Sequence, residues 1–220
     1  MPNFNDPLEV ERILIFNRDA KLQYPDAINM PSITEKTKSD YRQEKENATA
    51  SDYLAFAEQH YAIARLLMHF SLWEYGSYCG QQMIETYLKA YIKEKGQTPK
   101  DIHDLRDILQ ICRELDPSQP FINGEHIEII ADMFNPFNEF PRYPVFKKGP
   151  SGGVGTVYPE NIYTLDYFAF KMREIVHTPD NRSSLFKDGH YKFGTLTSRY
   201  PDIYRLITDK NINFQIQEQS

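Results

Sequence analysis

The sequence predicts an all-α protein, an up-and-down antiparallel bundle of four to five helices. Five segments between residues 51 and 178 carry apolar residues at spacings of three and four, the period of an amphipathic helix. Pro, Gly or helix-capping residues separate these segments, and no stretch shows the alternating strand and helix pattern of an α/β protein. With 220 residues, 40% of them hydrophobic, the chain is long enough to bury a substantial core.

The first two helices are expected to form an antiparallel hairpin. The first spans about residues 52 to 74, with Ser51 or Asp52 as its N-cap. Gly76 is expected to interrupt the chain, after which a second, strongly amphipathic helix runs to a stop at Gly96. Because the join between them is short, the two helices must lie side by side and antiparallel.

Three further helices complete the predicted bundle. The third begins with Asp101 as its cap, and the fourth opens at Asn123 and ends at Pro136. A Pro- and Gly-rich loop of about two dozen residues follows, a length that is uncommon inside a compact domain. Asn161 then caps a fifth helix, which stops before Pro179.

Composition divides the chain into three parts. Residues 1–50 are polar, with one short helical pattern near residues 8–16, and are expected to form a partly ordered leader. Residues 51–178 form the helical bundle. Residues 179–220 form a C-terminal extension with one short helix at about 202–208.

Charge and hydropathy exclude several classes of protein. The net charge of −6 argues against bulk binding to DNA, which requires a basic face. No secretory signal is visible, and no apolar run approaches the roughly 20 residues that span a bilayer, so a soluble cytoplasmic protein without membrane contact is expected. Cys79 and Cys112 fall on apolar stripes and are expected to be reduced core residues.

Two enzyme-like patterns lack the context that their chemistry requires. Gly149, Ser151 and Gly153 spell the G-x-S-x-G of a hydrolase, but no helix starts at this serine, as a nucleophile elbow demands. Glu174 and His177 form E-x-x-H, half of a di-iron site, and the sequence holds no second copy. We therefore expect neither a metal site nor a cofactor.

Polar residues on the second helix have two interpretations. Gln81, Glu85 and Lys89 are spaced four apart and share one helical face, with Glu85 and Lys89 in the favourable order for an exposed ion pair. They are either the solvated edge of an amphipathic helix or part of a working site.

A resemblance supports the second interpretation. The segment QQMIETYLKAYIKEKGQTPKDIHDLRDIL, residues 81–109, resembles the signature of the HEPN family, the higher eukaryotes and prokaryotes nucleotide-binding domain. In that signature a helix with a Gln-Gln, Glu and Leu-Lys-Ala run is followed by a loop and a His-Asp-Leu that opens the next helix. The Arg-Tyr-Pro at residues 142–144 is similar to a motif in one branch of the family. The resemblance extends over about residues 50 to 178.

The resemblance implies a helical bundle, often a homodimer, that associates with nucleotides or RNA. It also implies a cleft for that ligand. The residues expected to line it are Gln82, Glu85, Lys89, His103, Asp104, Arg142 and Tyr143.

Many HEPN proteins are metal-independent ribonucleases that use an Arg followed, after four to six residues, by a His. This chain departs from that pattern. Only three residues separate Arg65 from His69 and Arg173 from His177. The second pair is the weak catalytic candidate, since a spacing of four places both side chains on one face of a helix.

Three functions follow from these observations. The favoured one is a nucleotide- or RNA-binding module without catalysis. The alternatives are a metal-independent ribonuclease of toxin type, as in toxin–antitoxin systems, and a dimerisation scaffold without a ligand.

Overall fold

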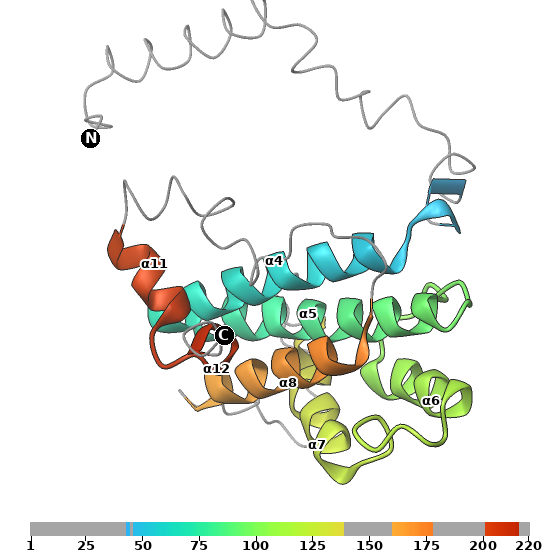
Figure 1. Cartoon of the computed structure of the whole chain (residues 1–220). Helices are drawn as coiled ribbons and strands as arrows, with labels where there is room; N and C mark the ends of the chain where they lie inside the picture. The colour runs from blue at the N-terminus through green and yellow to red at the C-terminus, as the bar shows by residue number, and fades with distance from the viewer. Residues whose placement is uncertain (1–42, 45, 139–159, 178–200, 216–220) are drawn as a thin grey trace, which may run out of the picture. The chain divides into compact units, whose positions relative to one another are not determined.

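The computed structural model describes residues 43–44, 46–138, 160–177 and 201–215. It divides into two compact units, Met1–Asn47 and Ala48–Ser220, and every helix discussed below belongs to the second. The described part of this unit is helical and contains no strand, which confirms the predicted all-α class (Figure 1). Within the described ranges, no helix has the length and apolar character needed to cross a membrane.

The predicted helical hairpin is confirmed. Helix α4, Ala50–His69, and helix α5, Trp73–Glu94, lie side by side and pack more extensively than any other pair of elements (Figure 1). The N-cap of α4 is Thr49, not Ser51 or Asp52. Its hydroxyl accepts from the Asp52 N–H while the Asp52 carboxylate accepts from the Thr49 N–H, a reciprocal capping box.

The break between the two helices comes earlier than predicted. Ser71 has a φ of 59° and lies between α4 and α5, whereas Gly76 lies inside the first turns of α5. A Cβ at Gly76 would lie 2.7 Å from Met68 Cγ and 3.3 Å from the carbonyl oxygen of Ala64. The glycine therefore does not interrupt the chain; it lets the backbones of the two helices approach each other.

We expect Gly76→Ala to lower the free energy of unfolding by about 1–3 kcal/mol, because the added methyl overpacks the α4–α5 contact. Chemical denaturation measures this loss. Gly96→Ala is the control: it has no atom within 4 Å of the added Cβ but a φ of +81°, so its cost comes from the backbone alone. Met68→Leu or Met68→Ala should change the loss of stability that Gly76→Ala causes. Neither should change the loss that Gly96→Ala causes.

Helices α6, Leu105–Leu115, and α7, Glu125–Phe134, form the next pair. Asp104 caps α6 through hydrogen bonds from two backbone N–H groups, so the predicted cap at Asp101 is wrong by three residues. Helix α7 begins after Gly124, and the Asn123 side chain instead donates to two carbonyls of the α6–α7 loop. A 3₁₀ turn, η2 (Asn135–Asn138), carries the chain beyond α7 through Pro136.

Helix α8, Asn161–Ile175, is the predicted fifth helix and packs on both α4 and α5. Asn161 is its first residue, and its N-cap is Glu160. Helix α11, Pro201–Thr208, confirms the predicted short C-terminal helix and packs on α4. A further helix that the sequence analysis did not foresee, α12 (Ile212–Gln215), packs on α8.

The core lies between α4, α5 and α8 and extends to α6 and α7. Its largest fully buried apolar and aromatic side chains come from four of these helices, and both cysteines are free thiols, Cys112 in the core and Cys79 half-buried beside it. The core members with the largest side chains are Tyr61, Met68, Met83, Tyr87, Tyr91, Phe134 and Phe168. Two groups of polar side chains are buried with this core.

Candidate functional site

The three polar residues of α5 that are spaced four apart, Gln81, Glu85 and Lys89, are buried and do not form a solvated edge. Gln81 is fully buried, Glu85 is 5% exposed and Lys89 is 6% exposed. The helical period placed them correctly on one face, but α5 is covered on several sides by α4, α6, α7 and α8. The interpretation as a wet helix face is therefore wrong for these residues.

Glu85 is the centre of a hydrogen-bonded group that we call the Glu85 cluster, formed by Gln81, Gln82, Glu85, Lys89 and His103. Lys89 Nζ donates to Glu85 Oε1 at 2.6 Å, and His103 Nδ1 lies 2.9 Å from the same oxygen. Gln81 Nε2 donates to Glu85 Oε2 and to the His103 carbonyl, both at 3.2 Å. Gln82 Nε2 donates to Gln81 Oε1 at 2.5 Å. Four of the five residues come from α5, and His103 comes from the segment before α6.

The start of α6 fixes His103 against α5. Asp104 caps α6, and its second carboxylate oxygen accepts from Asn135 Nδ2 at 3.0 Å, while Asn135 Oδ1 accepts from the Leu105 N–H. The hydrogen bond from Asn135 is the largest cause that lowers the pKa of Asp104. Asp104, a predicted ligand residue, thus caps α6 and binds Asn135, and it directly follows His103 in the chain.

His103 is the part of the cluster that reaches solvent. Its side chain is half exposed, whereas those of Glu85 and Lys89 are nearly covered. Since the carboxylate accepts the Nδ1 proton, Nε2 is the ring nitrogen through which a ligand can be bound. A second imidazole, His60 of α4, lies within the field of Glu85: burial lowers the pKa of His60, and the Glu85 charge acts in the opposite direction.

The chain was compared with protein families, with curated proteins and with solved structures. The model of the HEPN domain family matches residues 50–163, just over half of the chain. The chain belongs to the HEPN domain family. No curated protein and no solved structure matches it. The matched range contains α4 to α7 and the whole Glu85 cluster, so the cluster belongs to the HEPN domain proper.

Arg142 and Tyr143, the two other predicted ligand residues of the HEPN domain, lie outside the described residues. Within the described ranges, no three His, Cys, Asp or Glu side chains are grouped so that they could hold a metal ion.

The weak catalytic candidates, Arg173 and His177, do not lie on one helical face. Helix α8 ends at Ile175 and Val176 is extended, so His177 lies beyond the helix and the predicted i, i+4 relation with Arg173 is wrong. The exposed His177 donates its backbone N–H to Glu94 Oε1 at 3.1 Å. Arg173 Nη1 donates to Asn213 Oδ1 at 3.4 Å. The two residues are each engaged in a different structural contact.

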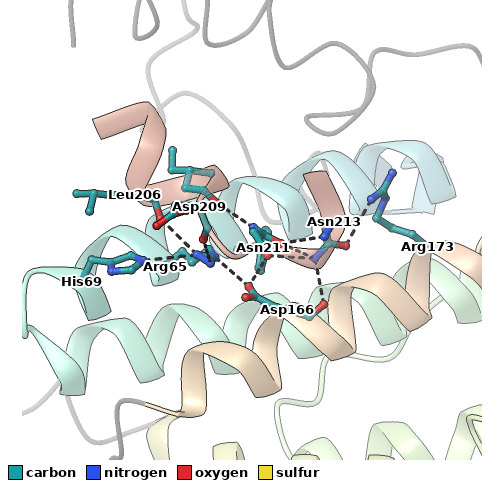
Figure 2. Close-up of polar contacts among 10 residues, drawn as sticks. Arg65, His69, Asp166, Arg173, Leu206, Asp209, Asn211 and Asn213 are labelled. Carbon is teal, nitrogen blue, oxygen red and sulfur yellow. Dashed lines mark hydrogen bonds and ion pairs between the residues drawn. The ribbon is translucent and has the colours of Figure 1, made fainter. Parts of the chain in front are cut away.

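A second buried polar group was not predicted, and Figure 2 shows it between α4, α8 and the C-terminal segment. We call it the Asp166 hub, formed by Tyr61, Arg65, Asp166 and Asn213. Asp166 Oδ1 accepts from Tyr61 Oη at 2.5 Å and from Arg65 Nε at 2.9 Å. The side chains of Arg65 and Asp166 are only 1% and 4% exposed. The spacing of four between Tyr61 and Arg65 is the one sequence signal that could have suggested the hub.

Asp166 is poorly solvated for a carboxylate. Its Oδ2 atom is buried and has no hydrogen-bond partner among the described residues. Burial raises the pKa of Asp166 to about 6, although the Arg65 charge and the Tyr61 hydrogen bond both act to lower it. The hub is thus a buried ion pair in which the Arg65 charge and the Tyr61 hydrogen bond only partly offset the lost hydration of the carboxylate.

The Arg65 and His69 pair of the HEPN domain is also part of this structure. Arg65 Nη1 lies 3.4 Å from His69 Nε2, and the guanidinium also donates to the carbonyls of Leu206 and Asp209 (Figure 2). Burial is the largest cause that lowers the pKa of His69, followed by the Arg65 charge. Because Arg65 is covered and its donors are engaged, it is not open to a ligand in this conformation.

Proposed function

We propose that this HEPN domain is a binding module for a nucleotide or a short RNA segment, and that the ligand binds at the His103 edge of the Glu85 cluster. His103 would make the contact through Nε2. Gln82, half-buried on α5 and hydrogen-bonded to Gln81, would offer its carboxamide. Arg142 and Tyr143 would complete the site, the Arg by clamping a phosphate and the Tyr by stacking on a base.

The observation that carries this proposal is a half-exposed imidazole held by a buried ion pair. A buried pair such as Glu85 and Lys89 contributes little to stability compared with apolar residues of similar volume, because both charges lose their hydration. The pair can instead fix the tautomer and the orientation of the exposed His103 ring, and this is a physical reason for a protein to retain it. Glu85 and Lys89 would then be positioning residues, and they would not touch the ligand.

The same geometry favours binding over the toxin-type ribonuclease. That chemistry requires a guanidinium on the phosphate and an imidazole that moves a proton, both directed into one cleft. Arg173 donates to Asn213, His177 lies beyond the end of α8 and not on the helical face of Arg173, and Arg65 is buried. A homodimer remains part of the proposal, since the family often forms one.

Binding can be tested by thermal shift and by calorimetry with a panel of nucleotides and short single-stranded RNAs. We expect at least one ligand to raise the melting temperature of the full chain, and we expect His103→Ala and Arg142→Ala each to abolish the shift. Lys100→Met removes an exposed charge near the same loop and should leave binding unchanged.

Three results would contradict the proposal. If no ligand raises the melting temperature of the wild type and the chain is a stable dimer, the result favours a dimerisation scaffold without a ligand. If His103→Ala binds as the wild type does, the site is misplaced. Metal-independent RNA cleavage that is lost in His177→Ala would favour the ribonuclease.

A further inference from the structure

The C-terminal segment of residues 201–215, which we call the strap, contains α11 and α12 and docks on the bundle through α4 and α8. It lies outside the residues that match the HEPN domain. In Figure 2 the strap lies against the Asp166 hub, to which it contributes Asn213, with Asn211 next to it. The strap is therefore an addition to the family domain that buries a charged part of that domain.

Arg65 recognises the end of a helix in the strap. Its Nη1 donates to the Leu206 carbonyl at 3.3 Å and its Nη2 to the Asp209 carbonyl at 3.0 Å. Both oxygens lie at the C-terminal end of α11, where carbonyl groups lack partners within the helix and carry partial negative charge. Lys210, with a φ of 50°, then turns the chain away. The guanidinium thus binds backbone groups, which any helix end can offer.

Asn213 provides the second point of recognition. Its Nδ2 donates to Tyr61 Oη at 3.1 Å and to the Asp166 carbonyl at 3.0 Å, while its Oδ1 accepts from Arg173. Asn211 Oδ1 accepts from the Asn213 backbone N–H and fixes this turn. The two asparagines are 0% and 3% exposed, so their carboxamides replace water on the α4 and α8 side chains.

The apolar part of the docking has one deeply buried anchor. Ile207 is the one apolar residue of the strap that is fully buried, and Ile212 is 42% exposed. The other apolar residues of the strap are half-buried: Ile203, Tyr204, Leu206 and Phe214. Segments with few buried apolar contacts open locally at a lower free energy than the core. On the bundle side, Asp166 accepts directly from both Tyr61 and Arg65, and neither of these two contacts involves a residue of the strap.

We propose that Tyr61, Arg65 and Asp166 form a peptide-binding slot that the chain's own strap occupies, and that the strap leaves as a unit so that another polypeptide can take its place. The incoming segment would end a helix and continue into an Asn-x-Asn turn, since these are the groups that the slot binds in the structure. A tethered strap has an effective concentration that a free peptide must overcome, so the slot is closed until the strap is weakened. This inference does not depend on nucleotide binding at the Glu85 cluster.

The first step of the test is release of the strap in the full chain. Ile207→Asp places a charge at the one apolar anchor, and Ile212→Asp places the same charge at an exposed position of the same strap. Amide hydrogen exchange should accelerate throughout residues 201–215 in the first variant, while α5 remains protected, and should change little in the second. Acceleration in α5 together with the strap would overturn the proposal, because strap and bundle would then be one cooperative unit.

The second step is binding in trans. A fluorescent peptide of residues 201–215 should bind the Ile207→Asp chain, as measured by anisotropy. Its affinity for the wild type and for the Ile212→Asp chain should be lower by a factor of about ten or more. A peptide carrying Asn213→Ala should lose about tenfold in affinity for the released chain, the effect of its missing hydrogen bonds.

A released chain that fails to bind the peptide would also overturn the proposal. If Ile207→Asp does not fold, Asn213→Ala in the full chain provides a milder release, with the same two measurements and the same expected results.

Discussion

Arg65→Ala is expected to lower the free energy of unfolding by about 3–5 kcal/mol, the cost of leaving a buried partner charge unpaired. The substitution removes the counter-charge of Asp166, and both side chains of the pair are at least 96% buried, so water cannot replace it. The carbonyls of Leu206 and Asp209 lose their donor as well. Chemical denaturation of wild type and variant measures the loss.

The loss should depend on pH. The folded-state pKa of Asp166, about 6, lies above its ordinary value of 3.8, so ionisation of this acid opposes folding progressively as pH rises between these values. Without Arg65 this pKa should rise further, because the Arg65 charge acts to lower it. At pH 5 the carboxyl group is mostly protonated with or without Arg65, so the substitution should cost less there than at pH 8.

A matched double substitution separates the ion pair from simple packing. Replacing Arg65 by Met and Asp166 by Leu removes both charges, and the double variant should be more stable than either single variant. A cost for Arg65→Ala that is below 1 kcal/mol, or that is the same at pH 5 and pH 8, would show that the hub is not an ion pair in solution.

Glu85→Gln is expected to lower the free energy of unfolding by about 3 kcal/mol, because it leaves the buried Lys89 ammonium without its counter-charge. Lys89→Met should cost less, about 1 kcal/mol, since Glu85 keeps its contacts with His103 and Gln81. Denaturation with urea measures both values. The two losses of stability differ because Glu85 is the acceptor that the other members of the cluster share.

The surface pair Lys171 and Glu174 provides the control. Its ammonium and carboxylate lie 2.7 Å apart, but the side chains are 33% and 47% exposed, and Glu174→Gln should change stability by less than about 0.5 kcal/mol. If Glu85→Gln is as mild as this control, the Glu85 cluster does not hold His103 in the way we propose.

The helices were predictable because each buries one stripe, and their starting residues were not. Asp101 and Asn123 are both good capping residues, yet Asp104 and Gly124 occupy the caps. The choice depends on tertiary contacts: Asn135 holds Asp104 at the start of α6, and the Asn123 side chain is used within a loop. Such contacts come from residues that are distant in the sequence or that have several local options.

The candidate site was predictable only in part, for the same reason. Four of the residues predicted from the family signature, Gln82, Glu85, Lys89 and His103, lie in one cluster. Their burial could not be predicted from one helix, because it results from the neighbours that cover α5. The Asp166 hub joins α4 to a residue 101 positions later, and no local pattern connects them.

The position of Asp166 bears on where this protein can be shortened. The family match ends at residue 163, three residues before the carboxylate that neutralises Arg65 inside the domain. A fragment trimmed to the matched range would keep the cation and discard its anion, together with most of α8. The smallest autonomous unit therefore extends past the family boundary, at least to the end of α8 at Ile175.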